Sequence, residues 1–228
     1  MLKTQLTGQV TSHLTQLHKN IYLHHDVKLP FLALQQSAKE AGFELHIASG
    51  FRSFERQKNI WNNKFGGNVA ILDKNERPLL KATLSDLDKL FSILHWSALP
   101  GASRHHWGTD FDIYDVKQLP AQQTLQLKTA EYDQGGYFYD LCAWLDENMQ
   151  KFGFYLPYRT YQGGVAREPW HISYFPISKP ALEEFDLDLI LTLIIENNVL
   201  GKSLICQQLP MIYKQYICNI NAPEHISK

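Results

Sequence analysis

One short stretch of the chain, residues 101–112, concentrates side chains that bind metal ions. It reads Gly-Ala-Ser-Arg-His-His-Trp-Gly-Thr-Asp-Phe-Asp. Zinc takes imidazole nitrogen and carboxylate oxygen, and a catalytic zinc site uses three protein ligands and leaves one position for water. His105 and Asp112 can supply two of the three ligands. Gly108, between them, permits the turn that brings them together, because glycine adopts backbone angles that other residues avoid. The stretch therefore predicts part of a catalytic zinc site.

The second half of this stretch has the pattern of a strand. Bulky and polar residues alternate from Trp107 to Tyr114, so Asp110, Asp112 and Tyr114 are expected on one face. Asp110 is an extra carboxylate beside a candidate ligand. It can either orient a ligand histidine or face a basic neighbour. His106 is interpreted as structural.

A third ligand is offered by the segment Glu168-Pro-Trp-His171. It is too rich in proline and aromatic residues to be helical. Residues three apart on a flat strand face opposite ways, so Pro169 predicts a bend or a strand start. With that bend, His171 can bind the metal and Glu168 can stand beside the metal-bound water as general base. Any one of these residues alone is better explained by an ordinary hydrogen bond, but the two clusters together favour a metal site.

The two clusters form the pattern Ser-x-His-x-x-Gly-x-x-x-Asp followed by Glu-x-Trp-His. This pattern resembles the VanY-like D-alanyl-D-alanine carboxypeptidases, which belong with lysostaphin, the D-Ala-D-Ala metallopeptidases and the zinc domain of hedgehog proteins. The resemblance covers residues 30–178. It implies one zinc ion per chain, bound by His105, Asp112 and His171, with Glu168 as the catalytic base. The family often has Ala where this chain has Asp110.

The segment Ser49-Gly-Phe-Arg-Ser53 precedes Gln57 and forms a further candidate. The guanidinium fork of Arg52 can pair with a carboxylate through two hydrogen bonds. From its spacing alone, Arg52 is better explained as a surface or structural residue. The segment also resembles the substrate segment of the family, however. That resemblance implies that Arg52 and Gln57, together with Ser103, receive the terminal carboxylate of a peptide.

The composition is that of an ordinary globular protein. The 228 residues are 44% hydrophobic and 20% charged, with a net charge of −1. This charge gives no electrostatic basis for binding nucleic acid or an anionic membrane. The first residues lack the apolar core of a secretory signal, and no apolar run is long enough to span a membrane. Three cysteines without Cys-x-x-Cys spacing predict free, mostly buried thiols. We therefore expect a cytoplasmic protein.

The hydrophobic periodicity predicts an α+β fold. A small, mainly antiparallel sheet carries the zinc site and is flanked by helices. Helices are predicted at 4–19, 31–40, 53–65, 137–152, 183–196 and 202–208, and from residue 85 to before Pro100. Strands are predicted at 43–49, 107–114, near Tyr155 and at 212–218, with a hairpin at 158–167 that leads into 168–174.

Two domains are expected, a catalytic domain at 1–180 and a mainly helical appendage at 181–228. The appendage is not basic, which argues against DNA binding. It is expected to pack on the catalytic domain or to form a homodimer contact.

The resemblance implies a zinc-dependent carboxypeptidase that removes the C-terminal D-alanine from peptidoglycan stem peptides. A cytoplasmic location favours LD-carboxypeptidase activity on tetrapeptides during wall recycling. DD-carboxypeptidase or D-Ala-D-Ala dipeptidase activity is a close alternative, and a phage-type endolysin is another. The non-enzymatic alternative is a zinc-binding interaction domain like that of hedgehog proteins. The presence of both Glu168 and Arg52 counts against that last alternative.

Overall fold

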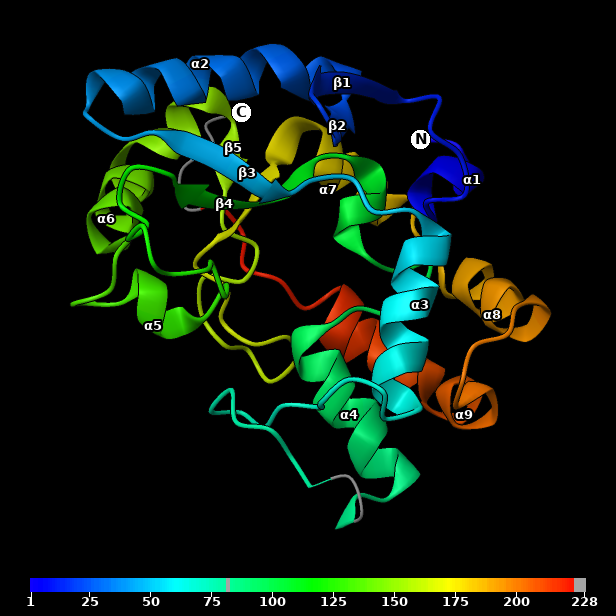
Figure 1. Ribbon diagram of the computed structural model, residues 1–228. Coiled ribbons are helices and arrows are strands. Elements are labelled where there is room, and N and C mark those ends of the chain that lie inside the picture. Colours follow the sequence, from blue (N-terminus) through cyan, green and yellow to red (C-terminus); the bar gives the residue numbers. More distant parts are fainter. Residues whose placement is uncertain (81–82, 224–228) are drawn as a thin grey trace.

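The centre of the molecule is a four-stranded antiparallel sheet with the order β3-β4-β6-β5 (Figure 1). The computed structural model describes residues 1–80 and 83–223. The strands are β3 (Leu45–Ser49), β4 (Asp110–Asp115), β5 (Phe154–Tyr155) and β6 (His171–Tyr174). Helices flank the sheet, so the predicted α+β class is confirmed.

The register of the sheet places the candidate ligands side by side. Asp112 on β4 pairs with His171 on β6, and Ser49 at the end of β3 pairs with Asp112 from the other side. Alternate residues of a strand face the same side. Asp110 and Asp112 therefore share a face, as the sequence predicts.

One face of the sheet is covered by α2 (Lys28–Glu40), which runs along it in Figure 1. Phe31 of this helix packs edge-on against Phe111 of β4. The same apolar cluster includes residues from α5 (Thr129–Tyr132) and α6 (Tyr139–Asn148), and α6 continues into a 3-10 turn at Met149–Phe152. This cluster covers one face of the sheet, and the candidate site lies on the other face.

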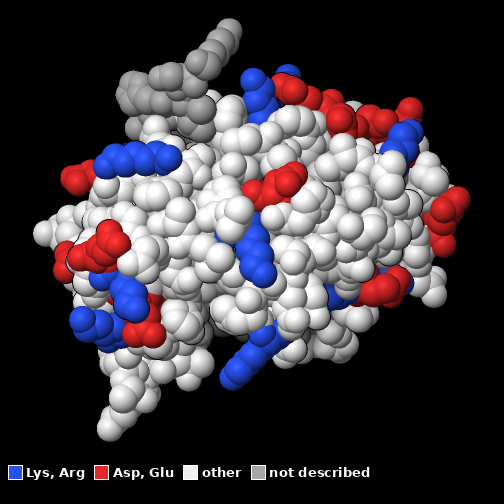
Figure 2. All heavy atoms as spheres, turned by 90° about the horizontal axis from the view of Figure 1, so that it is seen from above, with Lys and Arg blue, Asp and Glu red and all other residues white. Residues whose placement is uncertain are grey.

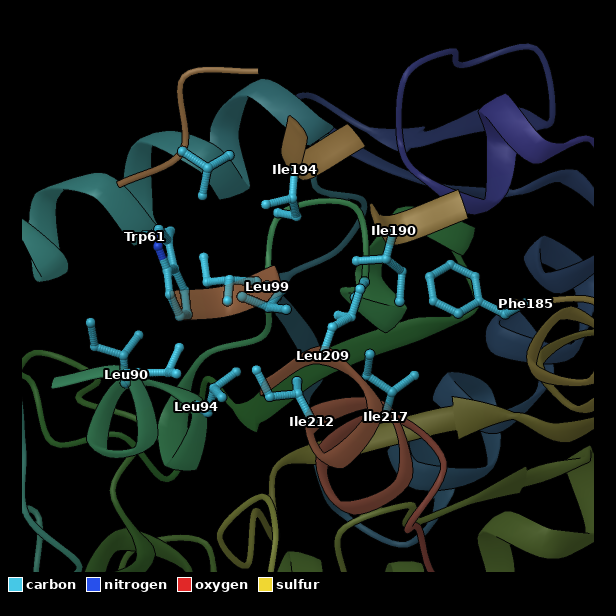
Figure 3. Packing of buried hydrophobic residues seen from close by; sticks show 14 of the residues in the cluster. Trp61, Leu90, Leu94, Leu99, Phe185, Ile190, Ile194, Leu209, Ile212 and Ile217 are labelled. Atoms are coloured by element: carbon cyan, nitrogen blue, oxygen red, sulfur yellow. The ribbon is translucent and has the colours of Figure 1, made fainter. Parts of the chain in front are cut away.

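A second apolar cluster joins the C-terminal helices to α3 and α4 (Figure 3). Its helices are α3 (Phe54–Phe65), α4 (Asp86–Trp96), α7 (Phe175–Glu183), α8 (Leu187–Glu196) and α9 (Lys202–Ile212). The cluster includes Trp61 and Leu94 from α3 and α4, and Ile190, Leu209 and Ile212 from the C-terminal helices, and all five are buried. The helices after residue 180 thus share a core with helices that precede the sheet's central strand.

The sequence predicts several of these helices accurately. Ser53 caps α3 by accepting a hydrogen bond from the Arg56 amide, and Ser85 caps α4 through a reciprocal arrangement with Asp88. Leu87, expected in the buried stripe of α4, is exposed. Ile93 is buried in that helix instead.

The predicted helix at 4–19 is wrong. Only α1 (Lys3–Leu6) is helical, and the chain then forms a hairpin of β1 (Leu14–His18) and β2 (Ile21–His24). Gly8 has a left-handed φ of 72°, and a side chain there would collide with the His106 ring. The leucines at helical spacing are therefore divided between a helical turn and a strand.

Three further expectations need correction. Residues 158–167 form a loop without strands, although β5 and β6 on either side of it do pair. The predicted strand at 212–218 is instead the end of α9 and a π-helical turn, Tyr213–Ile217. A short apolar run fits either structure, and packing decides between them. Cys218 is exposed and the other two cysteines are half-buried, so the thiols are less buried than predicted.

The charges are dispersed on the face seen in Figure 2. Acidic and basic side chains are interspersed there, without a broad region of one sign. Among the described residues, no helix combines the length and the hydropathy that a membrane span requires.

Candidate active site

A tight turn delivers the candidate ligands of the central stretch to the sheet. Arg104–Trp107 form a 3-10 turn, Gly108 reverses the chain with a φ of 68°, and β4 begins two residues later. A Cβ atom on Gly108 would lie 2.7 Å from the backbone nitrogen of His24. Glycine is therefore required both for the backbone angle and for the close approach of the β1–β2 hairpin.

His105, Asp112 and His171 form a buried triangle. The nearest atoms of His105 and Asp112 are Nε2 and Oδ2, 3.5 Å apart, and those of His171 and Asp112 are Nδ1 and Oδ1, also 3.5 Å apart. One ligand atom from each residue can be chosen so that all three lie within 4.8 Å of one another. All three residues are at most 6% exposed. The structure therefore brings together the three residues that the sequence assigns to the metal.

The second nitrogen of each histidine is already engaged. His105 Nδ1 lies 3.0 Å from the Gly50 carbonyl oxygen, and His171 Nε2 lies 3.0 Å from Asp110 Oδ1. Each of these nitrogens donates its proton to an acceptor that cannot itself donate. In the neutral form of each ring, the other nitrogen is then unprotonated and faces Asp112. This is the donor set that suits a zinc ion, so the residues present fit the metal that the pattern implies.

Asp110 fulfils both roles that the sequence left open. Besides its contact with His171, its Oδ1 accepts a hydrogen bond of 2.6 Å from Arg104 Nε. Thr109 and Ser173 donate to its other oxygen. Burial favours the neutral acid, but Arg104 and the His171 hydrogen bond outweigh burial and lower the pKa of Asp110. Asp110 is thus held as a carboxylate that orients the His171 ring.

Glu168 lies beside the triangle because the chain bends before β6. The His171 amide donates to the Glu168 carbonyl oxygen, which closes the predicted turn across Pro169. Glu168 Oε2 is 3.3 Å from His171 Nδ1. Its carboxylate therefore stands next to the position that the three candidate ligands surround.

The titration of the triangle is set by burial and by mutual charge. Burial, followed by the positive charge of Arg52, lowers the pKa of His105 well below its ordinary value. Burial raises the pKa of Asp112 to about 6, against the effects of His171 and Arg52. For His171, burial is outweighed by hydrogen bonds to Asp110 and Glu168, which raise its pKa to about 9. A cation among these groups would favour the ionised Asp112 and the neutral histidines.

Arg52 lines the same pocket, and the buried Gln57 lies behind it as its hydrogen-bond partner. Arg52 Nη1 donates to Gln57 Oε1 at 2.9 Å, and Gln57 Nε2 is held by the Ala98 carbonyl at 2.7 Å. Arg52 Nη2 is 4.0 Å from Asp112 Oδ2. Among the residues that the structure describes, the buried Arg52 Nε atom has no hydrogen-bond partner. Ser103 is also buried and lines the pocket, so two of the three residues assigned to a substrate carboxylate line it and the third, Gln57, holds Arg52 from behind.

His106 is confirmed as structural by its contacts. Its Nδ1 hydrogen bonds to the Arg52 carbonyl oxygen, and its Nε2 accepts from the Gly101 amide at 3.1 Å. It faces away from the triangle and ties the turn before β4 to the start of α3.

The pocket has a volume of about 310 Å³ and includes residues that the sequence did not indicate. Tyr158 packs against the His171 ring, with 5.0 Å between the ring centroids. Lys64 and Ser97 line another part of the pocket, and Ile212 and Tyr216 bring the C-terminal helices to its wall. No motif marks these positions, because contacts between distant segments place them there. The one available signal is the helical spacing of Lys64 from Gln57.

A buried histidine-aspartate-histidine triangle with a carboxylate beside it is the arrangement of a metal-dependent hydrolase. Comparison with known proteins gives the family. Residues 20–177 match the family model described as VanY, D-alanyl-D-alanine carboxypeptidase. The chain therefore belongs to the VanY family of D-alanyl-D-alanine carboxypeptidases and is a metallocarboxypeptidase, a peptide hydrolase.

Individual relatives agree with this assignment. An uncharacterized protein of Haemophilus influenzae is 42% identical over 121 residues, which are 52% of this chain and 92% of that protein. The D-alanyl-D-alanine carboxypeptidase of Enterococcus faecalis is 29% identical over 157 residues, 67% of this chain and 48% of the relative. The chain thus matches about half the length of that carboxypeptidase.

A solved structure, VanYB in complex with D-Alanine-D-Alanine, has a similar fold. The TM-score is 0.54 at 26% identity, over 77% of this chain and 83% of the other.

Proposed function

We propose that the protein is a zinc-dependent carboxypeptidase that removes the C-terminal D-alanine from peptidoglycan stem peptides. One observation carries the proposal. The His105–Asp112–His171 triangle, the Glu168 carboxylate and Arg52 line one pocket, and the buried Gln57 accepts a hydrogen bond from Arg52. Removal of a terminal residue requires a metal centre, a base and a group that binds the terminal carboxylate, all close together.

In this proposal, His105 Nε2, Asp112 and His171 Nδ1 hold the zinc ion. Zinc in such a site lowers the pKa of a bound water toward ~7 and polarises the scissile carbonyl. Glu168 takes a proton from the attacking water and delivers it to the leaving amine. Asp110 keeps the His171 ring in place during these steps through its hydrogen bond to Nε2.

The substrate's free carboxylate is proposed to bind at Arg52, Gln57 and Ser103. Within the described residues, Arg52 Nη1 donates to Gln57 and Nη2 donates to Ser49, and Nε has no partner. A guanidinium has five donor hydrogens, so Arg52 keeps donors for an incoming carboxylate. Gln57 is fixed by Ala98, and this contact in turn orients the guanidinium. A receptor at this position lets only the last residue reach the catalytic carboxylate.

For the bond cleaved, we propose LD-carboxypeptidase activity on tetrapeptides as the first candidate. In that substrate, a residue with a long side chain precedes the terminal D-alanine. Besides Arg52, the pocket is lined by Lys64, Trp96 and Tyr216, which supports room for a large residue. A role in wall recycling, in the cytoplasm, is part of this proposal.

DD-carboxypeptidase activity is the second candidate. The observation in its favour is the likeness to VanYB, which was solved with D-Alanine-D-Alanine.

Product analysis tests the activity. The protein is incubated with tri-, tetra- and pentapeptide stems, and the products are weighed by mass spectrometry. Loss of one alanine from the tetrapeptide is the expected result. Loss from the pentapeptide alone would favour the DD bond. Internal cleavage would favour the endolysin alternative.

Metal analysis tests the zinc centre separately. The purified protein is expected to bind one zinc ion, and His105→Ala, Asp112→Ala and His171→Ala are each expected to lose it. Undiminished zinc in all three variants would rule out this ligand set. Zinc without hydrolysis of any stem peptide would favour the non-catalytic binding domain.

A further inference from the structure

Lys64 lies on the wall of the catalytic pocket, on the same helix as Gln57. The two residues are seven apart on α3, which is close to two turns, so their side chains leave the helix on the same face. Seven residues separate the two backbone positions by ~10 Å along the helix axis, but the Lys64 side chain reaches Ser97, next to the Ala98 carbonyl that holds Gln57. Lys64 therefore adds a second basic group, besides Arg52, to the wall of the pocket.

The Lys64 ammonium has no carboxylate partner among residues 1–80 and 83–223. Its Nζ atom contacts Ser97 Oγ at 2.5 Å, and Ser97 also lines the pocket. Lys58 and Lys89 make a useful contrast. Each of them pairs with an acidic residue three positions earlier, at 2.8 Å. A half-buried ammonium that has only a hydroxyl beside it is costly, because removing a charge from water is unfavourable unless the charge is paired.

The neighbourhood of Lys64 is already positive. Burial, followed by the charge of Arg52, lowers the pKa of Lys64, and Glu168 offsets this only from a distance. With zinc bound as proposed above, Asp112 and Glu168 together balance the metal. Arg52 and Lys64 then remain as two positive charges in one pocket. The terminal carboxylate of a peptide accounts for only one of them.

We propose that Lys64, with the Ser97 hydroxyl beside it, is a second anion-binding position, and that the substrate carries a second carboxylate. This inference rests on the proposed carboxypeptidase function and narrows its substrate. Arg52 takes the terminal carboxylate in the proposed function, so a second carboxylate at Lys64 belongs to a preceding residue of the same peptide. A stem peptide whose residue before the terminal D-alanine carries a free side-chain carboxylate fits. A peptide with only an amine at that side chain would bring a like charge toward Lys64.

Matched peptides test the inference. Two tetrapeptides are compared that differ only in the side chain before the terminal D-alanine, a free carboxylate in one and its amide in the other. The wild-type enzyme is expected to prefer the carboxylate by at least ~10-fold in kcat/KM, mainly through KM. Lys64→Met is expected to lose this preference, because its kcat/KM falls much more on the carboxylate peptide than on the amide peptide. Lys64→Arg, which restores the charge, is expected to regain part of the preference.

The control is Lys58→Met, on the same helix but outside the pocket, which should keep the wild-type preference. Equal losses on both peptides in Lys64→Met, or an unchanged preference, would overturn the inference.

Calorimetric binding of both peptides to Glu168→Gln gives a readout independent of turnover. If the wild type hydrolysed neither peptide, the carboxypeptidase function would fail. Tighter binding of the carboxylate peptide, lost on adding Lys64→Met, would still support the anion site, and equal binding of the two peptides would contradict it.

Discussion

Asp110 accepts hydrogen bonds from His171 and Arg104 at the centre of the sheet. A family member with alanine at this position cannot orient the histidine in this way. Arg104 also donates to Ser173 and Tyr155, so the extra carboxylate is part of a buried network. At the scale of the residue, the His171 ring is held by a buried network of polar groups.

Glu168 is the residue whose chemical role can be isolated most cleanly. Glu168→Gln keeps the shape of the side chain and removes the base, so we expect the fold and the bound zinc to persist. The kcat on a stem peptide should fall by ~10²–10⁴-fold, because general base catalysis supplies about that factor. Steady-state kinetics and metal analysis of the same preparation check this. Glu55→Gln, on the exposed side of α3, is the control. Near-native turnover in Glu168→Gln would mean that another group is the base.

The candidate ligands could be predicted from the sequence because each cluster is local. His105 and Asp112 flank one turn, and Glu168 and His171 flank one bend. The pairing of β4 with β6 then brings the two clusters together. Lys64 and Tyr158 could not be predicted in this way. Their roles come from the pocket into which the tertiary fold places them, and no local pattern marks it.

At the scale of elements, the loop before Glu168 is held by hydrogen bonds from residues 215–221. The Asn221 amide donates to the Pro157 carbonyl oxygen at 2.9 Å, and Asn219 Nδ2 donates to the Gln162 carbonyl oxygen at 2.7 Å. Gln215 contacts Gly163 in the same region. The C-terminal segment thus holds the loop that carries Tyr158 and leads to the catalytic carboxylate.

Gly164→Ala tests this fastening, because a Cβ atom there would collide with the Gln215 carbonyl oxygen. We expect a loss of about 1–3 kcal/mol in the free energy of unfolding, as is usual for overpacking, together with reduced kcat/KM. Denaturant titration and peptide hydrolysis measure the two effects. Gly163→Ala is the comparison. An alanine there would be strained by the φ of 90°, but its Cβ atom would approach no atom of the described residues closer than 4.0 Å. Wild-type stability and activity in Gly164→Ala would show that the contact does not hold the loop.

The errors in the predicted elements have a common physical cause. Leu6, Val10, Leu14 and Leu17 recur at helical spacing, yet Leu14 and Leu17 pack in β1. The run Ile212–Cys218 has the composition of a strand, yet it continues a helix whose Ile212 and Ile217 face the second core. Local periodicity is a weak signal in short segments, and tertiary packing overrides it. Helices with a serine cap and a long apolar stripe were predicted well.

At the scale of the molecule, the candidate site lies between two apolar clusters. One cluster packs α2 and α6 against the sheet, and the other joins α3 and α4 to the C-terminal helices. Since residues after 180 contribute to the second cluster and to the pocket wall, we propose that the appendage at 181–228 acts with the catalytic domain. A homodimer contact through it stays a prediction.

Buried neutral histidines predict an acid-sensitive fold. Burial, followed by the charge of His25, lowers the pKa of His24 to about 4 from an ordinary value of 6.5. The folded form therefore resists protonation. The stability that depends on a neutral His24 is complete above pH ~6.5 and is lost as the pH falls toward 4. We expect His24 to account for about 2 kcal/mol or less of the stability lost between pH 7 and 5.

Denaturant titrations of the protein across this range measure that loss. His24→Asn should flatten the pH dependence, and His18→Asn, on the exposed side of the hairpin, should not. A pH dependence that is the same in the wild type and in His24→Asn would contradict the assignment.

The central claim is that Arg52 receives a free terminal carboxylate. Its most direct test is the hydrolysis of one stem tetrapeptide supplied as the free acid and as the C-terminal amide, by the wild type and by Arg52→Ala. A charged hydrogen bond is worth ~1.5–3 kcal/mol, so the wild type should hydrolyse the acid at least ~10-fold better in kcat/KM. Arg52→Ala should lose a similar factor on the acid and little on the amide. Equal wild-type rates on the two peptides would contradict the carboxypeptidase assignment and favour an endopeptidase.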